Sequence, residues 1–128
     1  MVRALLDTHA FLWAISGNVK LSRRAGEIFV GPSDLWLSVA SIWEILIKAQ
    51  SGKILLPQPT GPYLVKKLAQ NKIGTLHVNL DHVLKLETLP MHHRDPFDRL
   101  LIAQSVHEKL PLVTSDAVFV RYPVEIIW

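Results

Sequence analysis

Apolar residues in this chain fall into short, nearly continuous runs that alternate with longer amphipathic segments. Short runs bounded by turn residues are typical of buried strands, whereas amphipathic segments are typical of helices. The runs predict strands over residues 2–7, 34–39, 75–79, 111–115 and 124–128. The amphipathic segments predict helices over residues 8–16, 21–30, 40–51, 63–72, 80–89 and 95–110, with a proline-rich connection over 56–62. Strands that alternate with helices predict an α/β fold with a mostly parallel sheet.

The composition is that of an ordinary globular domain. The chain has 128 residues, which suits a single domain over 1–128, and 49% of them are hydrophobic, enough for a sizeable core. Trp13, Trp36 and Trp43 lie in apolar segments and are expected in that core. The absence of cysteine excludes disulfides and thiolate metal sites, and it is compatible with a reducing compartment. The net charge of +3 weakly favours a polyanionic partner.

Nothing in the sequence has the pattern of a membrane or export segment. No apolar stretch reaches the length of a transmembrane span. The apolar start, "MVRALLDTHAFLW", is interrupted by charged residues and lacks a small-residue cleavage site. We therefore expect a cytoplasmic protein without a membrane partner.

Asp7 and Asp116 each follow an apolar run that is predicted to be a strand. An acid in this place is often a helix cap or a turn residue. The carboxyl ends of parallel strands are also the edge at which α/β proteins bind ligands. Each of the two positions, taken alone, is compatible with both roles.

Glu44 lies within an apolar helical segment, directly after Trp43. It has the spacing for an ion pair with Lys48 and for a capping box with Ser41. A carboxylate on a buried helix is costly unless it is paired or bound to a cation. Glu44 is therefore a candidate for a structural ion pair or for a cation site.

Asp95 and Asp98 lie on either side of Pro96, at the start of the longest predicted helix. Asp95 fits the N-cap and Pro96 the first helical position, while Asp98 is placed where negative charge favours the helix dipole. Leu101 and Ile102 follow Asp98 by three and four positions, so Asp98 lies at the edge of a buried face. Capping accounts well for Asp95 and less well for Asp98.

Four acids are therefore predicted to meet at one edge of the sheet: Asp7, Glu44, Asp98 and Asp116. Carboxylates this close repel one another, and some stay protonated unless a cation is present. An all-oxygen site without cysteine suits a hard ion, Mg²⁺ or Mn²⁺, and such ions typically assist phosphoryl chemistry.

Five stretches in their order and spacing resemble the PIN domain (PilT N-terminus) family and, more closely, the VapC-type ribonuclease toxins of prokaryotic toxin–antitoxin pairs. They are "LLDTHAFLW", "SVASIWEILIK", "GKILLP", "HHRDPFDRLLIAQS" and "LPLVTSDAVFVRYPVEIIW", and they span nearly the whole chain. The resemblance implies a three-layer α/β/α domain with endoribonuclease activity, in which metal-assisted water attack leaves a 5′-phosphate and a 3′-hydroxyl. It also implies a cognate antitoxin that blocks the cleft, and a homodimer.

The same resemblance assigns roles residue by residue. The family's four acids match, in order, Asp7, Glu44, Asp98 and Asp116. Asp95 belongs to a "DPFD" variant of the third motif and is expected to be auxiliary, and Thr114 matches the hydroxyl residue before the last acid. The chain departs from the pattern at His9, where many PIN domains carry Asn, which affects a contact behind the metal site.

The loop "HHR", His92 to Arg94, precedes the third motif and is a candidate for phosphate contacts. Basic surface loops are commonly just solvated, so this alternative stays open. A soft-metal site at the two histidines is rejected, because no third nitrogen or sulfur ligand is obvious.

Other enzyme classes fit less well. A phosphorelay receiver needs an acidic pair after the first strand, a haloacid-dehalogenase phosphatase needs Asp-x-Asp, and a nucleotide-binding loop needs a glycine upstream of "SGK". The alternative is a non-catalytic PIN-fold module for RNA binding or interaction. Such a module is expected to have lost at least one of the four acids, and all four are present, so we favour the active nuclease.

Overall fold

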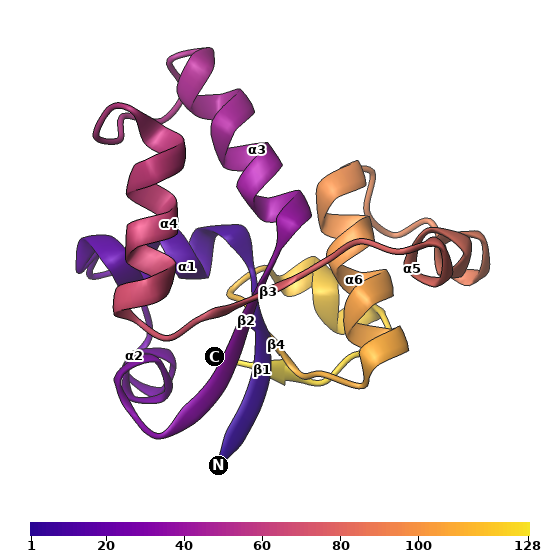
Figure 1. Cartoon of the computed structure of the whole chain (residues 1–128). Coiled ribbons are helices and arrows are strands. Elements are labelled where there is room, and N and C mark those ends of the chain that lie inside the picture. Colours follow the sequence, from indigo (N-terminus) through magenta and orange to yellow (C-terminus); the bar gives the residue numbers. More distant parts are fainter.

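The sheet is parallel throughout. The computed structural model describes all 128 residues, and its strands are arranged in the order β3-β2-β1-β4-β5 (Figure 1). Each neighbouring pair is parallel, which confirms the α/β prediction. The strands are β1 (Val2–Leu6), β2 (Ser33–Ser38), β3 (Gly74–Leu76), β4 (Leu112–Val113) and β5 (Ile126–Ile127).

Helices connect successive strands. The α-helices are α1 (Thr8–Ser16), α2 (Arg23–Val30), α3 (Val39–Gln50), α4 (Thr60–Gln70), α5 (Leu80–Lys85) and α6 (Pro96–Glu108). Two 3₁₀ segments complete the chain: η1 (Leu86–Thr88) and η2 (Ala117–Arg121). None of the helices is long and apolar enough to cross a membrane.

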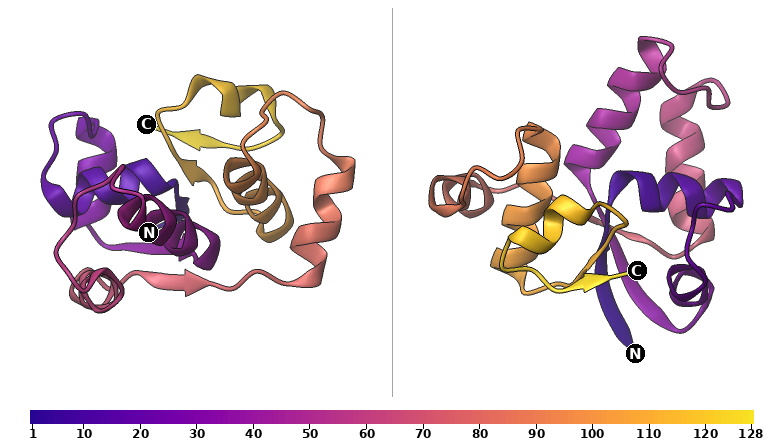
Figure 2. Two further views of the ribbon diagram at one scale, coloured as in Figure 1. Left: turned by 90° about the horizontal axis from the view of Figure 1, so that it is seen from above. Right: turned by 180° about the vertical axis from the view of Figure 1, so that it is seen from behind.

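Alternate residues of the central strands bury opposite faces of the sheet, and this gives three layers. Ala4 and Leu6 of β1 pack with residues of α1, α2, α3 and α4, whereas Leu5 packs with α6 and η2. Figures 1 and 2 show these two groups of helices on the two sides of the sheet. The α/β/α architecture implied by the family resemblance is therefore confirmed.

Several predicted boundaries were wrong. The helix predicted over 63–72 begins earlier, at Thr60. Proline is tolerated in the first turn of a helix, because backbone N–H groups there have no partner within the helix, so Pro62 does not prevent this start. The helix predicted over 80–89 consists of α5 followed by η1, and η2 was not predicted at all.

Trp43, expected in the core, is 62% exposed and packs edge-on against Phe97, with ring centroids 5.2 Å apart.

Candidate active site

The candidate site lies where β1 and β4 end side by side. The Asp7 N–H donates to the Val113 carbonyl over 3.0 Å, so Asp7 continues directly from the ladder between these strands. The chain leaves β1 for β2 on one side and reaches β4 on the other. Parallel sheets bind ligands at such a switch point, outside the carboxyl ends of the strands.

Asp7 is buried and fixed from two directions. Its side chain is the N-cap of α1, accepting from the His9 N–H over 3.3 Å, while the Thr114 hydroxyl donates to Oδ2 over 2.6 Å. Thr114 Oγ1 in turn accepts the Asp116 N–H over 3.1 Å, so one hydroxyl links the two strand-end acids. Burial raises the pKa of Asp7, opposed by the Thr114 hydrogen bond. Asp7 is thus a cap and a buried acid at the sheet edge at the same time.

Glu44 faces the same edge from the second turn of α3. It is only 4% exposed, and its two oxygens accept from Thr8 Oγ1 over 2.8 Å and Lys48 Nζ over 2.9 Å. The predicted ion pair with Lys48 is therefore confirmed. The predicted capping box with Ser41 is wrong, because α3 begins at Val39, after the N-cap Ser38. The hydrogen bond from Lys48 to Glu44 raises the pKa of the ammonium group.

Asp95 is the N-cap of α6, as predicted. Its Oδ1 accepts the N–H groups of Phe97 and Asp98 over 2.9 and 3.0 Å, and Pro96 occupies the first helical position. This geometry accounts for the Asp95 carboxylate without any further role.

Asp98 behaves differently although it lies only three residues later. Burial, followed by the charges of Asp95, Asp7, Glu44 and Asp116, raises the pKa of Asp98 to about 8. All of the named acids thus act electrostatically on one carboxyl group. At neutral pH this group holds a proton unless a cation replaces it.

Asp116 completes the edge. Its Oδ1 accepts the Val118 N–H over 3.0 Å and so caps η2, which confirms the cap alternative. Its Oδ2 lies 3.4 Å from His93 Nε2, and the same nitrogen lies 3.0 Å from Asp98 Oδ2. One donor atom from each of His93, Asp98 and Asp116 falls within 4.8 Å of the others. The carboxyl oxygens of this edge, without any thiolate, fit a hard divalent ion.

The "HHR" loop does not act as one unit. His93 is 17% exposed and faces the carboxylates, whereas His92 and Arg94 are exposed. The His92 ring packs edge-on against Tyr122, with centroids 5.3 Å apart. The sequence did not predict the place of His93 among the acids or the hydrogen bond from Thr8 to Glu44.

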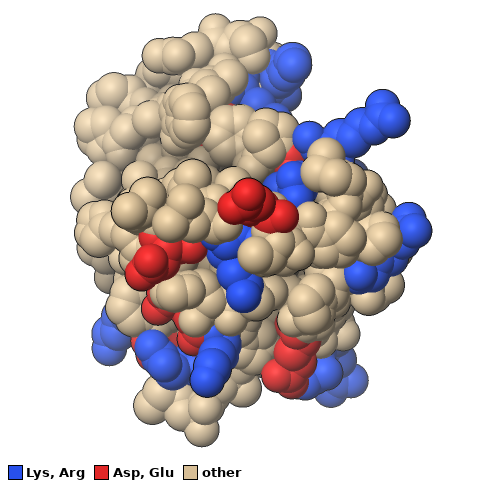
Figure 3. Space-filling view, turned by 90° about the vertical axis from the view of Figure 1, so that its right-hand side faces the viewer, with Lys and Arg blue, Asp and Glu red and all other residues tan.

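His9 lies at the exposed rim of the site. Its backbone N–H bonds to Asp7, while its ring packs on Trp13 with centroids 5.8 Å apart. A pocket of about 450 Å³ is lined by residues that include His9, Trp13, Lys48 and Lys53. The face on the α5 and α6 side carries interspersed basic and acidic side chains (Figure 3). The basic side chains on that face therefore do not form one broad basic patch.

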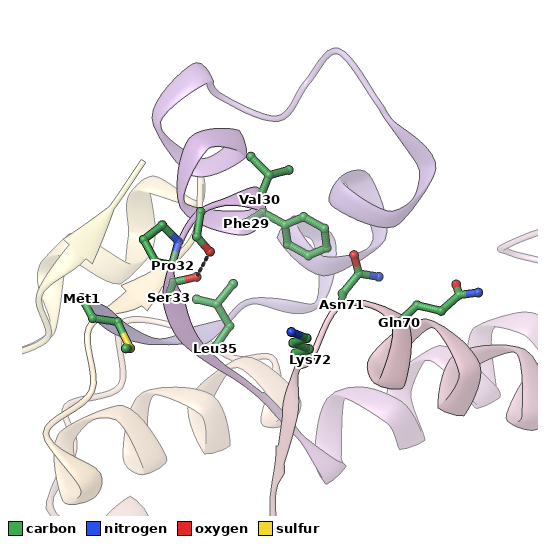
Figure 4. A pocket seen from close by; sticks show the side chains of 10 residues that line it. Met1, Phe29, Val30, Pro32, Ser33, Leu35, Gln70, Asn71 and Lys72 are labelled. Carbon is green, nitrogen blue, oxygen red and sulfur yellow. Dashed lines mark hydrogen bonds between the residues drawn. The ribbon is translucent and has the colours of Figure 1, made fainter.

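Two other features have structural explanations. Buried His82 closes the capping box of α5 through Nδ1 and contacts Glu108 through Nε2 over 2.9 Å, so both of its ring nitrogens are engaged. A cavity of about 510 Å³ lies at the opposite edge of the sheet, where α2 leads into β2 and α4 leads into β3 (Figure 4). Lys72 has the only charged side chain in its lining, so the cavity lacks the acids that a cation site needs.

The sequence profile of the PIN domain family matches residues 4–125. The chain belongs to the PIN domain family. No curated protein sequence matches it closely enough to serve as a relative. The family membership agrees with the sequence resemblance and with the parallel three-layer fold.

Solved structures share the fold of this PIN domain at low sequence identity. A chain of VapBC2 from Rickettsia felis, bound to a DNA fragment from its promoter, has a TM-score of 0.71 and 14% identity over 99% of this chain and 98% of that one. DNA-bound VapBC from Salmonella typhimurium gives 0.71 and 15%, with 99% and 98% covered. A toxin–antitoxin complex from Klebsiella pneumoniae gives 0.67 and 17%, with 98% and 96% covered. At such identities the likeness concerns the fold.

The geometry of Asp95 gives a first prediction. Asp95→Ala should lower the free energy of unfolding by about 0.5–2 kcal/mol, because the N-cap of α6 is lost. Asp95→Asn keeps an oxygen that can accept the same two N–H groups, and it should stay within a few tenths of a kcal/mol of the wild type. Chemical denaturation measures both values. Weaker Mn²⁺ binding by folded Asp95→Asn than by the wild type would show instead that Asp95 takes part in a cation site.

Proposed function

We propose that this PIN domain is a divalent-metal-dependent endoribonuclease and the toxin of a VapBC-type toxin–antitoxin pair. The observation that carries the proposal is the gathering of acids from separate elements around the half-buried Asp98 carboxyl group at the switch point, which also raises its pKa. Capping accounts for Asp7 and Asp116 and the Lys48 pair accounts for Glu44, each one at a time, but these roles do not account for their convergence on Asp98. A divalent cation bound among these carboxylates would offset their mutual repulsion.

The residues that would hold the ion are Asp98 and Asp116 on one side, and Asp7 and Glu44 on the other. Mg²⁺ or Mn²⁺, when bound there, supplies the charge that activates a water molecule and stabilises the leaving oxygen of the phosphodiester. Thr114 keeps Asp7 oriented through its 2.6 Å hydrogen bond. Thr8 does the same for Glu44 over 2.8 Å.

Cations of the chain itself are placed to receive the RNA backbone. Lys48 is 30% exposed while bonded to Glu44, so its ammonium group can also meet a phosphate oxygen. His92 and Arg94 are exposed on the loop before α6, and we propose them as further phosphate contacts. His93 is set apart from them by its contacts with the acids.

The partners follow from the family rather than from the site. The similar solved structures are VapBC or toxin–antitoxin complexes. We therefore propose a cognate antitoxin that covers the carboxylates, a homodimeric toxin, and a cytoplasmic location where cellular RNA is the substrate. A basic antitoxin side chain that reaches the acids would form a desolvated ion pair with them.

The proposed activity is tested by metal removal. Purified protein should cleave cellular RNA when Mn²⁺ or Mg²⁺ is added, and cleavage should stop in excess chelator because the carboxylates then lack their cation. Products should carry a 5′-phosphate, which end-labelling detects. Full activity of verified metal-free protein would contradict the mechanism. Absence of cleavage under every metal condition would favour the non-catalytic PIN-fold module that binds RNA or a protein partner.

A further inference from the structure

The His93 ring lies between two acids that come from different parts of the fold. Nε2 is 3.0 Å from Asp98 Oδ2 and 3.4 Å from Asp116 Oδ2. Asp98 belongs to the first turn of α6, whereas Asp116 lies between β4 and η2. One nitrogen atom therefore touches the two acids that would hold one side of the metal.

The other ring nitrogen defines what His93 can offer. Nδ1 accepts the Asp95 N–H over 3.2 Å, so in the neutral ring the proton is carried by Nε2. Nε2 then carries the proton and lies within contact distance of the Asp98 and Asp116 carboxylates. A histidine that binds metal has the opposite arrangement, because its second nitrogen normally donates a proton to a carbonyl or carboxylate. This arrangement favours a role for His93 in holding the carboxylates over direct ligation of the ion.

The ring is also fixed in place before any ligand arrives. The His93 N–H donates to the Tyr122 hydroxyl over 2.7 Å, and its ring packs against Phe119 with centroids 5.7 Å apart. Both aromatic residues are buried. Together with the Asp95 bond, these contacts determine where the Nε2–H group points.

We propose that His93 is a positioning residue whose single Nε2–H group bridges Asp98 and Asp116 and keeps their remaining oxygens available to a divalent ion. The inference rests on the proposed metal-dependent function. It assigns a role to a residue that lies outside the four acids and that could otherwise be taken for a phosphate contact or a metal ligand.

Two substitutions separate the two ring nitrogens. In His93→Gln, the side-chain amide reaches about as far as Nε2 and can still donate to the carboxylates. In His93→Asn, the shorter amide reaches only to the position of Nδ1, so it can accept the Asp95 N–H but leaves the two acids without their bridge. The measurement is the Kd for Mn²⁺ by calorimetry, on intact protein without RNA.

We expect His93→Gln to keep the wild-type Kd within a few-fold. His93→Asn should raise the Kd by about 10–100-fold, the usual effect of removing a group that orients metal ligands. His77→Asn is the matched control, because His77 is an exposed histidine after β3 and its side chain has no contact with the acids. This control should bind Mn²⁺ as the wild type does.

Three outcomes would overturn the proposal. Unchanged Mn²⁺ affinity in folded His93→Asn would show that the bridge is unnecessary. Imidazole nitrogen coupling in pulsed EPR of the Mn²⁺-saturated wild type that disappears in Mn²⁺-saturated His93→Asn would show that His93 is a direct ligand. Failure of the wild type to bind Mn²⁺ at all would remove the proposed metal dependence as well, whereas the first two outcomes leave that function intact.

Discussion

Asp98→Asn is expected to abolish RNA cleavage while leaving the metal-free protein at least as stable as the wild type. Asparagine keeps the size of the side chain and is neutral without taking up a proton, whereas Asp98 must be protonated because burial and the charges of the neighbouring acids disfavour its ionised form. Relief of this repulsion and of the burial cost should hold or raise the melting temperature without metal. Losing a direct ligand should weaken Mn²⁺ binding by more than the roughly 10–100-fold that is usual for losing a residue that only orients a ligand.

The matched control is Asp81→Asn. Asp81 lies in the first turn of α5 as Asp98 lies in the first turn of α6, but it is exposed and away from the other acids. It should lose only the small helix-dipole contribution, about 0.3–1 kcal/mol, and should keep full cleavage. Near-normal turnover by folded Asp98→Asn would refute the assignment of Asp98. Destabilisation of the metal-free variant would show that the Asp98 charge is compensated within the protein.

The sequence was most informative where local chemistry decides the structure. The N-caps at Asp7 and Asp95 were both readable, because each is an oxygen-bearing side chain just before a helical pattern. Strand ends followed by acids placed Asp7 and Asp116 at one edge, since parallel strands end together. The cap and the site are alternatives for Asp7 in the sequence, but in the structure this one carboxylate caps α1 and also lies buried at the sheet edge.

The parts that the sequence could not provide depend on contacts between distant residues. His93 was grouped with His92 and Arg94 as a basic loop, and the contacts that direct its ring toward the acids include the Tyr122 hydroxyl, 29 positions further on. Trp43 was expected in the core because its neighbours are apolar, yet α3 turns it outward onto Phe97. Periodicity shows that a helix has an apolar side, but the arrangement of the neighbouring helices decides which residues are covered.

The raised pKa of Asp98 gives the last prediction, which concerns stability against pH. The folded protein holds a proton on Asp98 up to about pH 8, whereas the unfolded chain releases it near pH 3.9. Between these values the unfolded state binds fewer protons, so the free energy of unfolding falls as pH rises, by up to about 1.4 kcal/mol per pH unit. The contribution is complete below the unfolded pKa and is lost as pH rises through the folded one.

The prediction is tested on the difference between two proteins, because other groups titrate in both. From pH 5 to pH 7, metal-free wild type should lose roughly 1–3 kcal/mol more stability than Asp98→Asn, which has no carboxyl group to titrate there. Asp81→Asn should follow the wild type. Saturating Mn²⁺ should reverse the trend in the wild type, since the ion displaces the proton and binds more tightly as pH rises. Parallel pH profiles for wild type and Asp98→Asn without metal would mean that Asp98 is ionised in the folded protein, and that the repulsion among the acids is already offset by the cations beside them.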